Sequence, residues 1–338
     1  MDISRFETEG FQALCDFVNY ENFPNIPTEA MERLHRILIQ AQGGQMSRPR
    51  VMFKIARSMI EHDLTEEEMQ DIYALGWVME LLQFAILASD DIVDKDLWRR
   101  GRWAWHCQPG VGQGAVFDTF VGAFLALAFL KKLFQNHPAY LDMVESINHE
   151  ILFLQLYQSF DTMVANQGPG NVSTFCAHKL RDISLGLCGY YYLPIALVLH
   201  YAGCASPENL RRTREITNEM AVYYQSQNDF LDLYGDRSKN GKGGRDIREN
   251  KCSWLIVEAL KICNEDQRAG LNARYGRVDE ESVTEVKQIF NDLNMPEAFK
   301  TYQTGALKQI EEKIKSLDGN GGLKADDFKY FLGLLVLV

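Results

Sequence analysis

Two short acidic segments carry side chains suited to binding a divalent cation and a phosphate group. In the first, Asp90 and Asp94 stand four residues apart after an apolar run over 81–88. On a helix this spacing places both carboxylates on one face, and carboxylate oxygens are ligands that Mg²⁺ prefers, shared with substrate phosphates. Arg99 and Arg100 follow, and guanidinium groups bind phosphate oxygens well. Taken alone, the motif leaves a solvated acidic helix end as the alternative.

The second acidic segment repeats this chemistry later in the chain. Asn228, Asp232 and Asp236 recur every four residues, so on a helix they form one stripe of oxygen donors. Basic residues follow again, at Lys242 and Lys251. Two acidic segments, each followed by cations, predict two metal-bearing walls that face across a cavity with a diphosphate between them. The glycines around Lys242 would let it close over a phosphate, although an ordinary surface loop is the alternative there.

The elements that must position these residues are helices. Thr65 and Glu68 fit a capping box at the start of the helix that delivers Asp90. The sequence contains no pair of alternating apolar runs joined by a hairpin turn, so it does not predict a sheet. We therefore expect an all-α protein forming one domain over 1–338, because no linker divides it. Apolar residues with a helical period predict helices at 27–42, 50–62, 65–95, 114–135, 139–166, 172–201, 206–236, 250–264, 280–293 and 296–317.

Composition narrows the class of protein and its partners. The 338 residues are 46% hydrophobic and 24% charged, which is typical of a soluble globular protein. A net charge of -11 argues against a nucleic-acid partner. The apolar run over 120–130 is too short to cross a bilayer, and the amino terminus lacks a signal-peptide pattern, so we expect no membrane partner. Seven cysteines without a CxxC pair predict reduced thiols and a cytoplasmic location.

A wider set of residues carries a family resemblance. Beyond the two acidic segments and Arg99-Arg100-Gly101, the set comprises Gln83, Gln158, Asp161, Tyr192-Leu193-Pro194-Ile195, Gly241-Lys242 and Asn250-Lys251-Cys252-Ser253-Trp254. From about Gln42 to the carboxyl end, the chain resembles the trans-isoprenyl diphosphate synthases, and most closely the animal farnesyl diphosphate synthases. The resemblance implies an isoprenoid synthase barrel of about ten helices around a deep apolar cavity. It also implies a homodimer, an allylic diphosphate substrate and three Mg²⁺ ions.

The resemblance assigns roles to individual residues. The expected metal ligands are Asp90, Asp94, Asn228, Asp232 and Asp236. The expected diphosphate-binding residues are Arg99, Arg100, Lys242, Lys251 and Gln225. The expected catalytic set, which ionises the substrate, is Asp90, Asp94, Arg99, Asn228, Asp232 and Lys242.

Three departures from the family change the expected reaction. The family's Gly-Gly-Lys-x-x-Arg motif has Gln45 in place of its lysine, and no cation follows Lys329 in the carboxyl tail. Losing a charged hydrogen bond to phosphate costs about 1.5–3 kcal/mol, so the site for isopentenyl diphosphate is expected to be weakened. Asn228 replaces the leading aspartate of the second motif, as in the metal triad of class I terpene cyclases. Drift in a weakened prenyltransferase is the alternative.

The positions before the first motif suggest a deeper pocket. Ala85 and Ile86 stand where animal farnesyl diphosphate synthases often have aromatic residues, so the cavity is expected to be deeper, with repacking of the core as the alternative. We therefore expect a terpene synthase, a carbon–oxygen lyase that converts farnesyl diphosphate to a sesquiterpene. One rival is a chain-elongating prenyltransferase that uses Arg48, Arg100 and Gln83 and makes farnesyl or geranylgeranyl diphosphate. The other is a non-catalytic synthase subunit.

Overall fold

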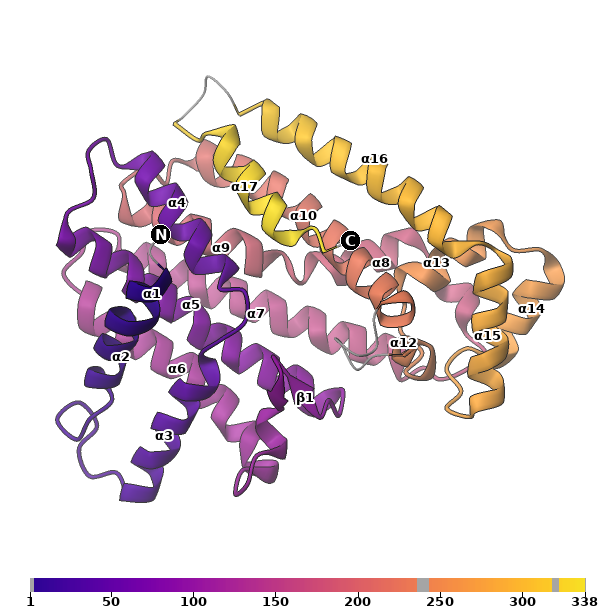
Figure 1. Cartoon of the computed structure of the whole chain (residues 1–338), viewed down its shortest axis with the longest axis horizontal. Coiled ribbons are helices and arrows are strands. Elements are labelled where there is room, and N and C mark those ends of the chain that lie inside the picture. Colours follow the sequence, from indigo (N-terminus) through magenta and orange to yellow (C-terminus); the bar gives the residue numbers. More distant parts are fainter. Residues whose placement is uncertain (1–2, 236–242, 318–321, 338) are drawn as a thin grey trace. The chain divides into compact units, whose positions relative to one another are not determined.

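The protein, described here by a computed structural model over residues 3–235, 243–317 and 322–337, is built almost entirely from helices (Figure 1). This confirms the predicted all-α class. The chain forms two compact units. Unit 1 comprises Met1–Ser146 with Pro194–Ser206, and unit 2 comprises Ile147–Leu193 with Pro207–Val338. The single domain over 1–338 stays a prediction.

Unit 1 carries the first acidic segment at the end of its central helix. Its helices are α1 (Ile3–Arg5), α2 (Phe11–Phe17), α3 (Thr28–Ala41), α4 (Ser47–Met59), α5 (Glu66–Val93) and α6 (Ala115–Phe134), with a π-helical turn at Phe6–Gly10 and 3-10 turns at Trp105–Cys107 and Gly112–Gly114. Helices α7 (Tyr140–Ala165) and α9 (Cys188–Tyr201) each run from one unit into the other.

Helix α5 is the main support of unit 1. It begins with the predicted capping box: the Glu68 N–H donates to the Thr65 hydroxyl, and the Thr65 N–H donates to the Glu68 carboxylate. From Ile72 onward nearly every side chain is buried, so the helix is enclosed on all sides. Helix α6 packs closely against it at Gly122, where a Cβ atom would lie 2.8 Å from the Phe84 ring. Asp90 and Asp94 therefore lie at the end of a long, well-packed helix.

A small hairpin follows α5 and was missed by the sequence prediction. Strands β1 (Trp98–Arg99) and β2 (Arg102–Trp103) pair antiparallel through a two-residue turn. Both turn residues, Arg100 and Gly101, have positive φ, which is the geometry of a type I′ turn and matches the twist of paired strands. Strands of two residues are too short to show an alternating pattern. The turn sends the consecutive side chains of Arg99 and Arg100 in different directions.

Unit 2 carries the second acidic segment near the end of its longest helix. Its elements are the remainder of α7 and α9, α8 (Ala177–Leu185), α10 (Pro207–Tyr234), α12 (Arg245–Arg248), α13 (Trp254–Ile262), α14 (Glu265–Arg274), α15 (Glu280–Asp292), α16 (Met295–Lys315), α17 (Ala325–Leu335) and a 3-10 turn at Val172–Thr174. The predicted helix over 172–201 is divided into α8 and α9. At the division, a Cβ atom on Gly186 would lie 2.2 Å from the Tyr157 Cβ atom, so only glycine permits this approach to α7.

The lengths of three apolar helices bear on membrane association, and the expectation of no membrane partner stays a prediction. The apolar run over 120–130 belongs to a longer helix, and three helices are long and apolar enough to cross a membrane by length and composition, over Glu66–Val93, Gly112–Phe134 and Ala177–Tyr201. Most of the apolar window is buried in the first and third, but only 39% of it in the second. None of the seven cysteines forms a disulfide, as expected. The cytoplasmic location stays a prediction.

Candidate active site

The first acidic segment occupies the last turn of α5 and the residues just after it. Asp90 and Asp94 lie one turn apart, and the Asp94 N–H donates to the Asp90 carbonyl oxygen at 2.8 Å. Both side chains are partly exposed, whereas Asp91 is buried. The consecutive aspartates therefore differ in role: Asp90 and Asp94 are accessible to an incoming ion, and Asp91 points into the protein.

Arg99 holds this acidic turn together. Its Nε atom donates to Asp91 at 2.7 Å, and its Nη2 atom contacts Asp90 at 3.3 Å and Asp96 at 3.2 Å. Burial opposes the charge of Arg99, but its bond to Asp91 and the nearby carboxylates raise its pKa above its ordinary value. Arg99 therefore stays charged and offsets the repulsion among the aspartates. Its predicted contact with a diphosphate stays a prediction.

Arg100 belongs to a second cationic cluster in unit 1. Its Nη1 atom donates to the Ala41 carbonyl oxygen at 3.1 Å, and its Nη2 atom lies 3.4 Å from the Glu80 carboxylate. The glycine-rich loop before α4 passes close by: Gly44 has φ +85°, and a Cβ atom there would lie 2.9 Å from Arg100 Nε. This is the loop in which Gln45, an exposed residue, replaces a lysine of the family pattern. The structure thus places the loop beside Arg100.

The second acidic segment lies on α10 in unit 2. Asn228 is half-buried and Asp232 is buried one turn further on. The Asp232 carboxylate accepts the Asp246 N–H at 3.1 Å, which ties α10 to the start of α12. Asp229, beside them, accepts the Gln225 amide and the Trp254 N–H, each at 2.7 Å. Asp229 therefore fixes α13 to α10.

Two residues predicted to bind diphosphate make contacts inside unit 2. Lys251 Nζ donates to Asp161 at 2.8 Å, with both side chains largely buried. Gln225 donates its amide to Asp229, so it supports the acidic segment directly. Their predicted contacts with substrate stay predictions. Asp236 and Lys242 lie outside the described residues.

The donors present suit Mg²⁺ bound together with a substrate. Across 3–235, 243–317 and 322–337, no three His, Cys, Asp or Glu side chains come together in a way that could hold a metal ion. Each acidic segment instead offers a pair of oxygen donors one turn apart, Asp90 with Asp94 and Asn228 with Asp232. Mg²⁺ is usually held by one or two carboxylates, with water and substrate phosphates completing its sphere. The residues therefore fit the ion.

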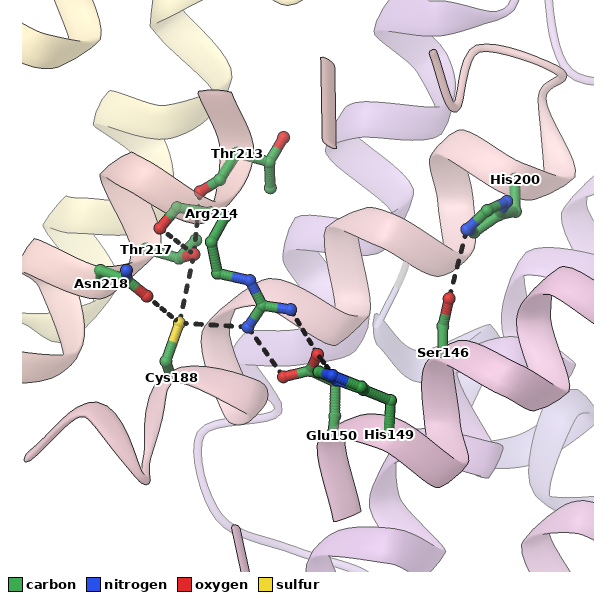
Figure 2. A network of polar contacts seen from close by, with 9 residues as sticks. All are labelled: Ser146, His149, Glu150, Cys188, His200, Thr213, Arg214, Thr217 and Asn218. Atoms are coloured by element: carbon green, nitrogen blue, oxygen red, sulfur yellow. Dashed lines mark hydrogen bonds and ion pairs between the residues drawn. The ribbon is translucent and has the colours of Figure 1, made fainter. Parts of the chain in front are cut away.

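The early turns of α10 are anchored by a polar network on α7 and α9 (Figure 2). Arg214 forms a bidentate pair with Glu150, with one contact at 2.8 Å, and lies 3.5 Å from the Cys188 sulfur. The Cys188 thiol donates to Asn218 at 2.7 Å. The Arg214 guanidinium also covers the Tyr192 ring at 3.4 Å. These contacts fix the base of the helix that delivers Asn228 and Asp232.

The residues predicted to set pocket depth are buried on α5. Ala85 and Ile86 are both enclosed within unit 1, and the aromatic residue in this turn is Phe84, which packs edge-on against Trp105. Their effect on the pocket stays a prediction. The sequence interpretation missed Glu80, which could have been recognised as an isolated carboxylate inside the apolar stretch of α5. It also missed the supporting role of Asp91, because Asp91 was grouped with the neighbouring aspartates of the motif.

Comparison with known proteins identifies the relatives of this chain. Residues 29–293 match the polyprenyl synthetase family. The farnesyl pyrophosphate synthase of Schizosaccharomyces pombe is 37% identical over 98% of this chain and 96% of its own. The enzyme of that name from Saccharomyces cerevisiae is 33% identical over 91% of this chain and 89% of its own.

A solved structure confirms the predicted isoprenoid synthase fold. The farnesyl diphosphate synthase of T. brucei complexed with a bisphosphonate superposes with a TM-score of 0.88. Each chain is covered over 98% of its length, at 23% sequence identity. At this identity the likeness concerns the fold alone.

The comparisons overturn the predicted reaction. The curated relatives are named for making farnesyl diphosphate, which is chain elongation, so the prediction of a sesquiterpene-forming terpene synthase is wrong. The lyase class is wrong for the same reason, because the relatives are transferases. The prediction gave too much weight to single positions. Gln45 removes one cation, but Arg48 and Arg100 remain, and Arg100 is held in place by several contacts.

Proposed function

The chain belongs to the polyprenyl synthetase family, and we propose that it is a chain-elongating prenyltransferase that joins isopentenyl diphosphate to an allylic diphosphate. The observation that carries this proposal is the match along nearly the whole chain to farnesyl pyrophosphate synthases. A prenyl diphosphate substrate agrees with the family. The cationic cluster around Arg100 supports a second diphosphate, which elongation requires and cyclisation does not.

The proposed reaction transfers a prenyl group between carbon atoms. The C1–oxygen bond of the allylic diphosphate breaks, and its electron pair leaves with the diphosphate. The double bond of isopentenyl diphosphate attacks C1, a carbon–carbon bond forms, and a proton leaves C2 of the added unit. The products are a longer allylic diphosphate, inorganic diphosphate and a proton.

The chain's own residues divide this task. Members of the family use Mg²⁺, which confirms the predicted cofactor, and the ion supplies positive charge to the departing diphosphate. Asp90, Asp94, Asn228 and Asp232 are the residues proposed to hold it. Arg99 keeps the first acidic turn in place, and Arg100 with Arg48 is proposed to bind the isopentenyl diphosphate. Binding two diphosphates on separate cations is what allows two anionic substrates to react.

We also propose that the protein is a homodimer. Exposed apolar side chains gather on one stripe of α6, at Val116, Phe117, Phe120 and Phe124. Helix α7 has further exposed apolar residues at Leu152, Phe153, Leu156 and Met163. Helices this apolar are normally covered, and a second copy of the chain would supply matching surfaces.

The test is a product analysis with and without the second substrate. Purified protein is incubated with Mg²⁺ and dimethylallyl, geranyl or farnesyl diphosphate, each with and without isopentenyl diphosphate. We expect longer diphosphates only when isopentenyl diphosphate is present, and their chain length by mass spectrometry distinguishes C15 from C20. Hydrocarbons or alcohols formed from farnesyl diphosphate alone, without elongation, would overturn the proposal. Complete inertness would favour a non-catalytic subunit and would overturn it as well.

A further inference from the structure

Unit 1 buries a carboxylate beside its cations. Glu80 lies on α5 with a relative exposure of 1%, within a stretch of apolar neighbours. Its Oε2 atom lies 3.4 Å from Arg100 Nη2, and the charge of Arg48 also acts on it. Burial raises the pKa of Glu80, and the charges of Arg100 and Arg48 oppose this rise. The presence of Glu80 at this position requires an explanation, because its negative charge reduces the attraction of Arg48 and Arg100 for an anion.

The reason lies in the Arg100 guanidinium group. Burial lowers the pKa of Arg100, because few water molecules screen its charge, and the like charge of Arg48 lowers it further. The Glu80 carboxylate opposes this shift, and its Oε2 atom lies 3.4 Å from Arg100 Nη2. Glu80 therefore stabilises the charged side chain of Arg100 and limits its movement.

The remaining contacts of Arg100 leave part of its guanidinium available. One Nη1 hydrogen is donated to the Ala41 carbonyl oxygen at 3.1 Å, and one Nη2 hydrogen is directed to Glu80. A guanidinium has five N–H groups, so others remain for an anion. The loop at Gly44 lies against the same side chain and limits its movement. Arg100 is therefore held on three sides and is preorganised.

Two buried oxygens near this cluster lack a partner among the described residues. The Glu80 Oε1 and Gln83 Oε1 atoms are both buried without a hydrogen bond there. Glu80 and Gln83 stand three residues apart on α5 and so share a face of the helix. Buried acceptors without donors are costly, and a ligand with its hydration water, or cations drawn in by it, would supply those donors.

We propose that Glu80 is a positioning residue for the diphosphate of the second substrate, holding the Arg100 guanidinium group in the orientation that binds it. This inference rests on the proposed chain elongation. Glu80 does not touch the diphosphate, since both are anionic. It acts through Arg100.

The substitution Glu80→Gln separates positioning from simple electrostatics. If charge alone mattered, removing a negative charge beside two cations would tighten the binding of a diphosphate. If Glu80 positions Arg100, the same change loosens the Arg100 guanidinium group and weakens binding. We expect the KM for isopentenyl diphosphate to rise about tenfold, the effect of one lost charged hydrogen bond. The KM for the allylic diphosphate should stay within about twofold, because its proposed site is on other residues.

Two further variants control for damage to the fold. Glu80→Asp keeps the charge but shortens the side chain, and should give a smaller rise in KM. Asp118→Asn is the matched control. Asp118 is also a buried carboxylate of unit 1; it lies on α6 and accepts hydrogen bonds from Arg33 and Trp105. It should lower the melting temperature without a selective change in the KM for isopentenyl diphosphate. If Glu80→Gln does not fold, Glu80→Asp carries the test.

Direct binding distinguishes failure of this inference from failure of the proposed function. Calorimetric titration of isopentenyl diphosphate into the full-length wild type and the Glu80→Gln variant should show about tenfold weaker binding to the variant. An unchanged or tighter affinity in a folded variant would overturn the positioning role, even if the wild type elongates chains. A wild type that neither elongates chains nor binds isopentenyl diphosphate would overturn both. Binding without elongation would overturn the proposed function only.

Discussion

Adjacent residues of the same type do different work in the first acidic segment. Asp90 and Asp94 are partly exposed on the last turn of α5, whereas Asp91 is buried and bound to Arg99. Helical spacing accounts for the difference, because residues four apart share a face and adjacent residues do not. A sequence motif that groups the three aspartates therefore contains one positioning residue and two candidate ligands.

This division predicts two distinct kinetic defects. Asp94→Asn weakens a Mg²⁺ ligand, so we expect kcat to fall at least about 100-fold and the Mg²⁺ concentration for half-maximal rate to rise. Asp91→Asn instead releases Arg99, and should raise the KM for the allylic diphosphate while leaving the Mg²⁺ requirement near that of the wild type. Diphosphate release measured across a Mg²⁺ titration separates the two. Identical Mg²⁺ dependence in both variants would show that the assignment is mistaken.

Substitution of Gln45 should increase the affinity for isopentenyl diphosphate. It is exposed in the loop that passes beside Arg100, where the family pattern has a lysine. We expect Gln45→Lys to add a cation for the second diphosphate and to lower the KM for isopentenyl diphosphate about tenfold. Gln45→Met, similar in length and uncharged, is the control and should leave this KM unchanged. An equal response to both substitutions would exclude a charge effect at this position.

At the scale of elements, the helical period was sufficient for most of the fold. Helices α5, α6, α7, α10 and α16 were predicted to within a few residues, because long amphipathic or fully apolar runs leave little choice. The break at Gly186 was missed because it depends on contact with Tyr157, which is distant in sequence. The hairpin after α5 was missed because two-residue strands carry no pattern. The spacing of apolar residues thus predicts the long helices, whereas the breaks between them depend on contacts with residues that are distant in sequence.

The carboxyl tail is fastened to α10 by one buried side chain. The Gln227 amide nitrogen donates to the Leu335 carbonyl oxygen at 2.9 Å, and its oxygen accepts the Leu337 N–H at 2.8 Å. Gln227 directly precedes Asn228, so the tail is held beside the second acidic segment. The absence of tail cations was read from the sequence as loss of a substrate contact. The structure shows a backbone attachment that needs no charge.

We expect Gln227→Met to destabilise the protein by about 2 kcal/mol, because two buried hydrogen bonds to the tail are lost. Urea unfolding followed by circular dichroism measures this change. Gln288→Met is the matched control, since Gln288 is exposed on α15 and donates to Asp292 in the same helix. The control should change stability by less than about 0.5 kcal/mol. Equal stability of both variants would mean that the tail attachment contributes nothing to folding.

At the scale of the whole molecule, similarity along the chain outweighed the individual departures. The acidic segments, the basic residues after them and the Mg²⁺ cofactor were predicted from residue types and spacing. The reaction was not, because Gln45, Asn228 and the apolar tail are each compatible with either chemistry. The contacts of Arg100 with Glu80 and Ala41 join residues 20 and 59 positions away in sequence, which spacing cannot reveal. The sequence showed that a lysine is replaced by Gln45, but it could not show that Arg100 is still held in place by its neighbours.

The proposed dimer is tested by placing charge on the apolar stripe of α6. Phe117 and Phe124 are 73% and 67% exposed, and burying a phenylalanine side chain contributes about 1.5–3 kcal/mol. We expect the wild type to sediment as a dimer at micromolar concentration. The double variant Phe117→Glu and Phe124→Glu should sediment as a monomer, because an interface would have to bury two unpaired carboxylates.

Val278→Glu provides the matched control for this experiment. Val278 is 75% exposed and lies between α14 and α15 in unit 2, whereas the stripe belongs to α6 in unit 1. It introduces the same charge at an equally exposed apolar position, so it should leave the sedimentation coefficient unchanged. A monomeric wild type, or a double variant that sediments like the wild type, would show that the stripe does not join two copies. Sedimentation velocity over a tenfold range of protein concentration distinguishes a weakened dimer from an abolished one, because only the former reassembles by mass action.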